Sequence, residues 1–424
     1  MKIWDVVVIG GGPAGLFAGI AAAEQGAQVL ILEKREKPGG KIPVSGGGRG
    51  NLTHVGEIPE LLRHYQGGET PDAAARFLKP ALYTFSNLDL MKFFSARGLP
   101  LGVEPDGRVF PKTDRAEDAL RVLLSELERT GVEIRTQTRV SKIQKVAHGF
   151  AIFAQGLATP IARGSSVILA TGGRSCPSLG ATGDGYRLAA ELGHRVVPPR
   201  PALVPVVVAS QVFSPFAEST GITLRGVGVT LIRRGKTVRK ARGGVLFTHQ
   251  GLSGPAVLNL SRDVEPGDIL RVSFLSEVKD TSAVEREFLA QARNHGRRTI
   301  SRALQELGLP LRLARALVRS LGMAAETRLA ELSREGRRAL VETLVEGYPF
   351  PIAGFASWEE AMVTRGGIAL NEVDHKTMES LLVRGLFFAG EVLDIDGETG
   401  GYNLQAAFST GFLAGKSAAQ KAKD

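Results

Sequence analysis

The chain lacks the features that mark secreted, membrane-spanning or thiolate-based proteins. It has one cysteine, Cys176, among 424 residues, which excludes an internal disulfide, a CxxC redox centre and a thiolate metal cluster. It has no run of 18 apolar residues, and its first residues lead into a strand-like segment without a charged leader. We therefore expect a cytoplasmic protein with no membrane partner.

The absence of two further motifs argues against a metal site and a second nucleotide-binding domain. The seven histidines form no HExxH pattern or other metal-ligand spacing, so we expect no metal. Between residues 100 and 380 there is no second GxGxxG flanked by a strand and a helix. A dedicated nicotinamide domain is therefore not expected, and any NAD(P)H would have to dock transiently.

Positive charge is in excess, with a formal net charge of +10 and a pI of about 9.8. This balance is unusual for a small-molecule enzyme and leaves room for a nucleic-acid or other acidic partner. A basic host proteome or a solubility requirement explains it equally well. The length itself predicts two or three domains.

The first 33 residues carry the pattern of a dinucleotide-binding unit. The apolar run Ile3–Ile9 predicts a strand, and the turn Gly10–Gly15 opens a helix whose N-terminal N–H groups suit a diphosphate. Gly12 would let the backbone approach the pyrophosphate. Glu33, at the end of the next strand, suits the hydroxyls of an adenosine ribose and would repel a 2′-phosphate.

A second glycine-rich segment, residues 38–51, follows this unit. Its many free N–H groups predict a loop that wraps a ligand held by the first turn, although a plain surface loop is the alternative. Lys41 and Arg49 would add positive charge for phosphates or for the edge of a flavin ring.

Later segments return to the same predicted crevice. The buried strand Ser166–Ala170 runs into Thr171-Gly172-Gly173, and the strand-like 385–391 ends in Gly390-Glu391. A final helix is predicted over Gln405–Ala414. The first domain is therefore predicted to be discontinuous.

The middle of the chain has a different pattern of apolar residues. Residues 202–209, 222–233 and 237–247 alternate like antiparallel strands, and 281–346 has helical spacing. The hairpin 225–242 is basic and contains no acid, which suits a phosphate backbone or simply a solvated face. The predicted fold class is α/β. The predicted domains are a dinucleotide-binding domain (1–197 with 357–424), a barrel-like β domain (198–276 with 347–356) and a helical domain (277–346).

The assembled motifs resemble the two-dinucleotide-binding-domain flavoproteins, and within them the bacterial BaiN-like or aminoacetone-oxidase-like FAD-dependent proteins. The matching stretches span nearly the whole chain: Ser45–Arg49, Gly107–Pro111, Thr182–Gly185, Leu246–Pro255, Val363–Gly367 and Phe388–Asp394. That family usually has Cys at the position of Gly50 and Tyr at the position of Cys176. A thiol role beside Arg49 is therefore not carried over.

The resemblance implies an oxidoreductase with FAD bound extended through the first domain. The N–H groups of residues 401–404 would face the flavin pyrimidine edge, and Asp394 would accept hydrogen bonds from ribityl hydroxyls. The residues expected to contact FAD are Gly10, Gly12, Pro13, Ala14, Gly15, Glu33, Lys34, Lys41, Ser45, Gly46, Gly47, Gly48, Arg49, Asn51, Val140, Thr171, Gly172, Gly173, Gly390, Glu391, Asp394, Gly401, Tyr402, Asn403 and Leu404.

A catalytic acid or base is less well marked. His249 is the best imidazole candidate, although it also suits a structural role in its turn. Cys176 before Pro177 would contact flavin or substrate, or it is a small buried thiol.

Three functional classes follow. The first is a flavin oxidase or reductase of a small molecule. The second is a flavin-dependent reductase of uridine in ribosomal RNA, which the positive charge favours slightly and which would contact RNA through the hairpin 225–242. The third is a non-catalytic FAD-binding sensor. Family members are linked to both amine oxidation and uridine reduction, so the resemblance fixes the cofactor better than the substrate. The sequence does not predict the oligomeric state.

Overall fold

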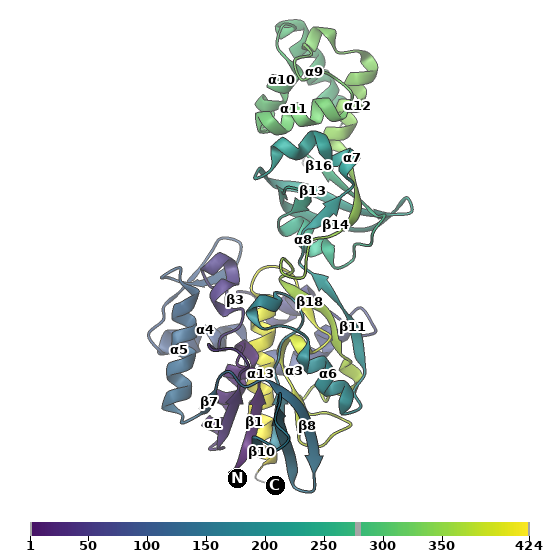
Figure 1. The fold of residues 1–424 in the computed structure, drawn as a ribbon. Coiled ribbons are helices and arrows are strands. Elements are labelled where there is room, and N and C mark those ends of the chain that lie inside the picture. Colours follow the sequence, from purple (N-terminus) through teal and green to yellow (C-terminus); the bar gives the residue numbers. More distant parts are fainter. Residues whose placement is uncertain (1, 276–280, 423–424) are drawn as a thin grey trace. The chain divides into compact units, whose positions relative to one another are not determined.

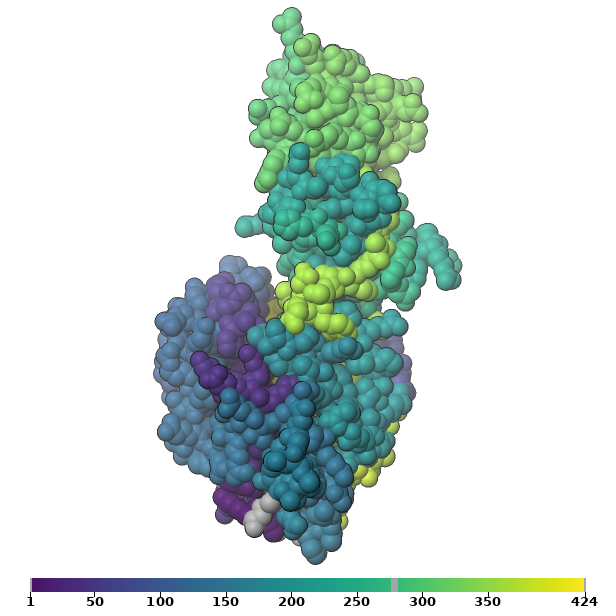
Figure 2. Space-filling view, viewed as in Figure 1, coloured from purple at the N-terminus to yellow at the C-terminus, as the bar shows by residue number. Residues whose placement is uncertain are grey.

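The structure, a computed structural model, describes residues 2–275 and 281–422. The chain divides into two compact units, which we call unit 1 (Met1–Pro201 and Met362–Asp424) and unit 2 (Ala202–Ala361). Each unit has its own hydrophobic core. The surface of unit 1 combines purple, blue and yellow segments from both ends of the chain, whereas unit 2 comes from one continuous teal-to-green stretch (Figure 2).

Unit 1 is built on one sheet with a parallel core. The strand order is β7-β2-β1-β10-β9-β8, and β19 pairs with β10. Strands β7, β2, β1, β10 and β19 are parallel, and β8 and β9 add an antiparallel edge. Their bounds are β1 Ile3–Ile9, β2 Val29–Leu32, β7 Glu133–Arg135, β8 Val140–Val146, β9 Gly149–Ala154, β10 Ala162–Leu169 and β19 Leu386–Phe388.

Two helices from opposite ends of the chain pack against each other beside this sheet. Helix α1 spans Pro13–Glu24 and α13 spans Tyr402–Lys421, so purple and yellow ribbons lie together in Figure 1. A Cβ at Gly411 or Gly415 would collide with the α1 backbone at Ala14 or Ala18. These two glycines therefore allow the close helix contact that completes unit 1.

Shorter elements surround this core. Helix α4 begins with a capping box, in which the Ser86 hydroxyl accepts the Asp89 N–H and the Asp89 carboxylate accepts the Ser86 N–H. The remaining elements of unit 1 are α2 Ile58–Leu61, α3 Ala73–Thr84, α4 Asn87–Ala96, α5 Ala116–Arg129, α6 Asp184–Glu191, β3 Thr53–His54, β4 Tyr65–Gln66, β5 Leu101–Val103, β6 Arg108–Pro111, β11 Val196–Ala202, β18 Val363–Ile368, β20 Asp396–Gly397, and the 3-10 helices η1 Ile42–Gly48, η2 Leu62–His64, η3 Pro177–Leu179, η6 Leu370–Glu372 and η7 Gly390–Val392.

A buried carboxylate stabilises α5. Glu126 is 5% exposed and accepts hydrogen bonds from Arg97 at 2.9 Å and Arg129 at 2.5 Å. The bonds from Arg97 and then Arg129 lower the pKa of Glu126 from 4.5 to about 2. The folded state therefore binds this proton less readily than the unfolded state. Its stabilisation is full above pH 4.5 and is lost as the pH falls toward 2.

We expect Glu126→Gln to lower the free energy of unfolding by about 1–3 kcal/mol at pH 7, because the charge-assisted bonds are lost. The difference from the wild type should shrink as the pH falls through the window from 4.5 to about 2. Thermal unfolding of both proteins at several pH values measures this. A difference that stays constant down to the acid end would contradict the assignment.

Unit 2 contains a closed antiparallel barrel with the strand order β12-β15-β14-β13-β16-β17. Along β13, buried Leu224, Val227, Val229 and Leu231 fill its interior, and a register shift between Leu224 and Val227 marks a bulge. The elements are β12 Val206–Val208, β13 Thr223–Arg233, β14 Lys236–Phe247, β15 Gly251–Ser253, β16 Ile269–Ser273, β17 Tyr348–Phe355, α7 Ser210–Phe213, α8 Pro255–Ser261, α9 Thr281–His295, α10 Ile300–Glu306, α11 Leu311–Ser320, α12 Arg334–Val345, η4 Ser214–Ser219 and η5 Leu329–Glu331.

The predicted fold class is confirmed: a discontinuous Rossmann-like part is combined with an antiparallel β part and helices. The strand expected over 202–209 is shorter, since only Val206–Val208 pair, and the final helix is longer than expected. The expected boundary between residues 276 and 277 lies outside the described residues. The division of unit 2 into a β domain and a helical domain stays a prediction.

Candidate functional site

The site predicted from the glycine motifs lies at one edge of the unit 1 sheet. Strands β2, β1, β10 and β19 are parallel, so their carboxyl ends meet at the same edge. Glu33 follows β2, the turn 10–12 follows β1, residues 170–173 follow β10, and residues 389–391 follow β19. In a parallel sheet this edge is where a nucleotide binds.

Glycine is needed in the first turn for two different structural reasons. Gly10 has φ +105°, and a Cβ there would lie 2.5 Å from the Ala170 carbonyl oxygen. A Cβ at Gly15 would collide with the Gly10 carbonyl oxygen. A Cβ at Gly12, by contrast, would meet no heavy atom within 4 Å. Contacts within the chain therefore require Gly10 and Gly15, whereas the absence of a side chain at Gly12 fits a pyrophosphate at the N-terminus of α1.

Glu33 is held by the same turn. Its carboxylate is 8% exposed and accepts the backbone N–H of Gly11 at 2.7 Å and of Arg35 at 2.8 Å. A carboxylate has about four acceptor positions, so capacity remains for ribose hydroxyls. The structure therefore gives Glu33 a geometry compatible with its predicted role.

Lys34, expected to contact FAD, has partners within unit 1. Its Nζ lies 2.8 Å from Asp184 and 2.5 Å from the Thr182 hydroxyl, and Arg139 lies 2.7 Å from the same carboxylate. Burial opposes ionisation of Asp184, but the bonds from Arg139 and Lys34 outweigh it and lower its pKa. No local sequence pattern indicates this ion-pair cluster.

The glycine-rich segment 38–51 folds over the first turn. The Gly39 N–H donates to the Gly11 carbonyl at 2.7 Å, and Gly46, Gly47 and Gly48 have positive φ. Ser45 donates to the Ile42 carbonyl at 2.8 Å. These contacts form a fixed loop, as the ligand-wrapping interpretation requires.

The two cations expected on this segment are paired with carboxylates. Lys41 lies 2.7 Å from Glu391, and Arg49 lies 2.7 Å from Glu104 and 2.8 Å from Asp114. Their charge is therefore largely compensated within the protein. The structure does not present them as two free cations for phosphate.

Helix α13 begins at the same edge. Gly401 has φ +99°, and a Cβ there would lie 2.5 Å from the Thr53 carbonyl oxygen. With its amide oriented to satisfy both groups, Asn51 accepts the Gly401 N–H at 3.0 Å and donates to the Thr53 carbonyl at 3.1 Å. The N–H groups of a first helical turn lack intrahelical partners, so those of residues 402–404 suit an acceptor such as the flavin pyrimidine edge.

An aromatic stack missed by sequence reasoning supports this helix start. The ring of Tyr402 lies between those of His54 and His64, with centroids 5.0 and 4.3 Å away. Burial and the nearby Glu398 carboxylate raise the pKa of Tyr402 to about 12, so the phenol is neutral at physiological pH. Because 338 or more residues separate Tyr402 from each histidine, no local pattern signals the stack.

Asp394 is 4% exposed and close to the segment after β4. Its Oδ2 accepts the Gly68 N–H at 3.0 Å, and a Cβ at Gly67 would collide with the Asp394 carbonyl. The carboxylate thus has a backbone partner that the sequence did not predict. Its contact with ribityl hydroxyls remains a proposal.

The two catalytic candidates lie in different units of the chain. Cys176 is half-buried in unit 1 with φ +51°, immediately before η3. His249 is exposed in the turn between β14 and β15 of unit 2. Val140 is buried in β8, paired with Ala154 of β9. These placements test neither the catalytic roles expected of Cys176 and His249 nor the FAD contact expected of Val140.

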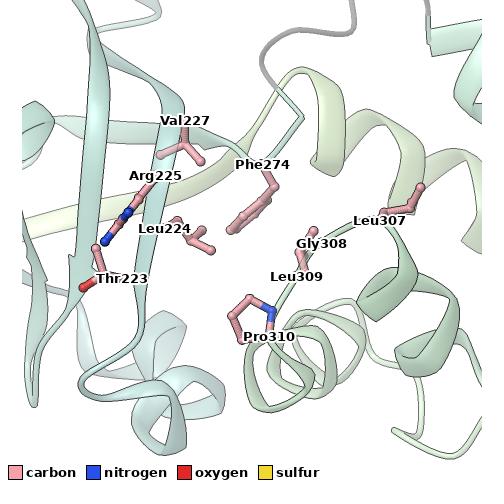
Figure 3. A pocket seen from close by; sticks show the side chains of 9 residues that line it. All are labelled: Thr223, Leu224, Arg225, Val227, Phe274, Leu307, Gly308, Leu309 and Pro310. Atoms are coloured by element: carbon pink, nitrogen blue, oxygen red, sulfur yellow. The ribbon is translucent and has the colours of Figure 1, made fainter. Parts of the chain in front are cut away.

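Unit 2 has a separate pocket of about 340 Å³ between β13 and the turn joining α10 to α11. Leu224, Phe274 and Pro310 point into it, and Arg225 points away from them (Figure 3). Leu224 and Phe274 are both less than 10% exposed and belong to the core of unit 2. This pocket is therefore lined by core residues of unit 2, and it contains none of the predicted nucleotide-binding motifs.

Two negative findings apply to residues 2–275 and 281–422. No group of three or more His, Cys, Asp or Glu side chains is arranged to hold a metal ion. No helix in those ranges has the length and apolar character needed to cross a membrane.

The fold and the glycine-lined edge define a Rossmann-type dinucleotide-binding protein. The model of the HI0933-like protein Rossmann domain family matches residues 4–417, and the chain belongs to this FAD-dependent family. The predicted family, its FAD cofactor and its oxidoreductase class are thereby confirmed.

Two relatives match along almost their whole length. The chain is 33% identical over 411 residues to the ribosomal RNA dihydrouridine synthase of Escherichia coli K12, covering 97% of this chain and 96% of the relative. It is 35% identical over 426 residues to the 3-dehydro-bile acid delta(4,6)-reductase of Clostridium scindens, covering 98% of each. Among solved structures, the 3-ketosteroid delta1-dehydrogenase of Sterolibacterium denitrificans aligns with a TM-score of 0.50 at 14% identity, covering 99% of this chain and 100% of that one, and supports the fold alone.

Proposed function

We propose that this oxidoreductase reduces uridine in ribosomal RNA to dihydrouridine, with NAD(P)H docking transiently as the reductant. In the balanced reaction, the C5=C6 double bond gains one hydride and one proton, and NAD(P)H becomes NAD(P)⁺. Bound FAD supplies the two-electron transfer between the two substrates. The protein supplies binding, orientation and charge.

The sheet order suggests how unit 1 holds FAD. Glu33 after β2 would bind the ribose, and Gly12 after β1 would admit the pyrophosphate. Residues after β10 and β19, together with the first turn of α13, would then hold the ring system. These assignments extend one ligand across adjacent strand ends in a single direction.

The RNA assignment depends mainly on where the positive charge lies. Unit 2 has 22 Lys and Arg against 16 Asp and Glu, so it carries +6 of the total +10 in fewer than half of the residues. Lys240 and Arg242 are exposed and alternate along β14, which places them on one face of the strand. Lys236 is exposed at the start of β14, beyond a register shift. Such a face suits a phosphate backbone.

Part of the basic hairpin is structural. Arg233 pairs with Asp268 at 2.9 Å, and Arg239 pairs with Asp263 at 3.0 Å. The proposed RNA contact is therefore made by the exposed members, which are Arg225, Arg234, Lys236, Lys240 and Arg242. This choice refines the contact expected for 225–242 as a whole.

A second candidate is reduction of a carbon–carbon double bond in a small molecule. The 35% identity to the bile acid reductase favours it. In that case the positive charge of unit 2 would have no role in substrate binding. The two candidates share FAD and NAD(P)H and differ only in the acceptor.

Mass spectrometry of nucleosides from ribosomal RNA tests the proposal in cells. A strain deleted for the gene should lose dihydrouridine from one ribosomal RNA site, and a plasmid copy should restore it. A plasmid copy carrying Gly12→Val should not restore it. An unchanged dihydrouridine profile in the deletion strain would count against RNA as the substrate.

A further inference from the structure

Lys41 and Glu391 form the centre of a polar network that connects four segments of unit 1. Lys41 Nζ lies 2.7 Å from Glu391 Oε2 and 2.5 Å from the Ser175 hydroxyl. Glu391 Oε1 accepts the Ser175 hydroxyl at 2.8 Å and the Thr364 N–H at 2.8 Å. A Cβ at Gly173 would approach the same oxygen to 2.8 Å, so the network fills the space above the Thr-Gly-Gly turn.

The network lies in line with the proposed path of FAD. Lys41 follows Gly40, where a Cβ would lie 3.5 Å from the Cα of Gly12. Ser175 lies six residues beyond β10, and Glu391 lies three residues beyond β19. An extended ligand that starts at Glu33 after β2 and passes Gly12 after β1 therefore reaches this network at its far end.

The pair is only partly shielded from water. The side chains of Lys41 and Glu391 are 20% and 19% exposed, while Ser175 is fully buried. Charges at such depth act on a neighbouring group more strongly than charges in bulk water. An ion pair that only stabilised the fold could lie anywhere in unit 1. The Lys41–Glu391 pair lies on the proposed path of the ligand, so we look for a functional explanation.

We infer that the Lys41–Glu391 pair, held by Ser175, positions the flavin ring and sets its reduction potential by balancing two opposite charges beside it. Reduction adds negative charge to the ring system, so a nearby cation favours it and a nearby anion opposes it. In the wild-type protein the opposite charges of Lys41 and Glu391 nearly cancel, so the pair has little net effect on the reduction potential. The inference rests on FAD binding as proposed above and does not depend on RNA being the substrate.

Single substitutions should shift the midpoint potential in opposite directions. Lys41→Met leaves the Glu391 carboxylate, still supported by the Ser175 hydroxyl and the Thr364 N–H, and should lower the potential. Glu391→Gln leaves the Lys41 cation and should raise it. Lys41→Met with Glu391→Gln should return the potential toward the wild-type value. Dye-coupled reductive titration of the purified holoproteins at pH 8 measures all four.

Lys145→Met is the matched control, because Lys145 donates to the Arg384 carbonyl just before β19, at the opposite end of that strand from Glu391. Its potential should equal that of the wild type. Lys41→Arg keeps the charge and should also leave the potential nearly unchanged. If the Lys41→Met protein fails to take up FAD, the comparison of Lys41→Arg with Glu391→Gln still tests the inference. Shifts of the same sign in Lys41→Met and Glu391→Gln, or no shift in either with FAD bound, would overturn the inference. A holoprotein that fails to reduce RNA leaves these measurements intact, so the two proposals fail separately.

Discussion

Gly12→Val should give a folded protein that no longer retains FAD. The backbone of Gly12 has φ −80° and ψ −175°, a conformation that valine adopts without strain. A Cβ there meets no heavy atom of the chain within 4 Å, so the apoprotein has room for the side chain. The same side chain would occupy the space needed by the pyrophosphate. We expect FAD affinity to fall by at least about 100-fold, which corresponds to about 3 kcal/mol.

Flavin absorbance of the purified proteins, together with thermal unfolding of the apoproteins, measures this effect. Gly15→Val is the matched control, because its side chain would collide with the Gly10 carbonyl inside the protein and should destabilise the fold itself. Gly12→Val protein that purifies with a full complement of FAD would show that the first turn does not hold the pyrophosphate.

Lys236→Glu combined with Lys240→Glu should weaken binding to ribosomal RNA by at least about 10-fold at low salt, through loss of two phosphate contacts and added repulsion. Both lysines are exposed on β14, and no ion pair with either is found among the described residues. The slope of log affinity against log salt should fall in magnitude by roughly 1.5, at about 0.7–0.9 per phosphate. Filter binding or fluorescence anisotropy over a salt series provides both values.

Lys79→Glu combined with Lys92→Glu is the control for net charge. These lysines are exposed on α3 and α4 of unit 1, so the double substitution changes the formal charge equally at another place. We expect its RNA affinity to stay within about 2-fold of the wild type, because these two lysines are not part of the proposed RNA contact. Equal losses in the two double variants would mean that only total charge matters.

Local patterns predicted the elements whose signals lie within one segment. The strand expected over Ile3–Ile9 matches the structure residue for residue, and the strands expected over 222–233 and 237–247 differ from it by one residue at one end. In each case hydrophobic period and a terminating turn coincide. The first β-turn-α-β unit was also predictable, because the glycine spacing has a specific mechanical meaning.

The final helix was predicted over 405–414 but extends over Tyr402–Lys421. Gly411 and Gly415 lower helix propensity, yet here they allow α13 to pack against the backbone of α1. That contact joins two ends of the chain, so its stabilising effect is invisible in a local window.

The ion pairs of the site were unpredictable for the same reason. Lys41 and Glu391 are separated by 350 positions, and Arg49 and Glu104 by 55. The sequence indicated that cations lie near the ligand, but only tertiary structure reveals the carboxylates that compensate them. Of the two partners expected for Lys41, a phosphate or the edge of a flavin ring, the compensated charge suits the ring edge, where we propose that the pair balances charge.

The most direct test follows electrons from the cofactor to the acceptor. The purified holoprotein is reduced by NAD(P)H without oxygen and then mixed with a ribosomal RNA transcript or, in parallel, with a steroid-like enone. We predict that the RNA restores the visible absorbance of oxidised flavin and that one uridine gains two hydrogen atoms. Flavin that stays reduced with RNA but is reoxidised by the enone would contradict the proposed function.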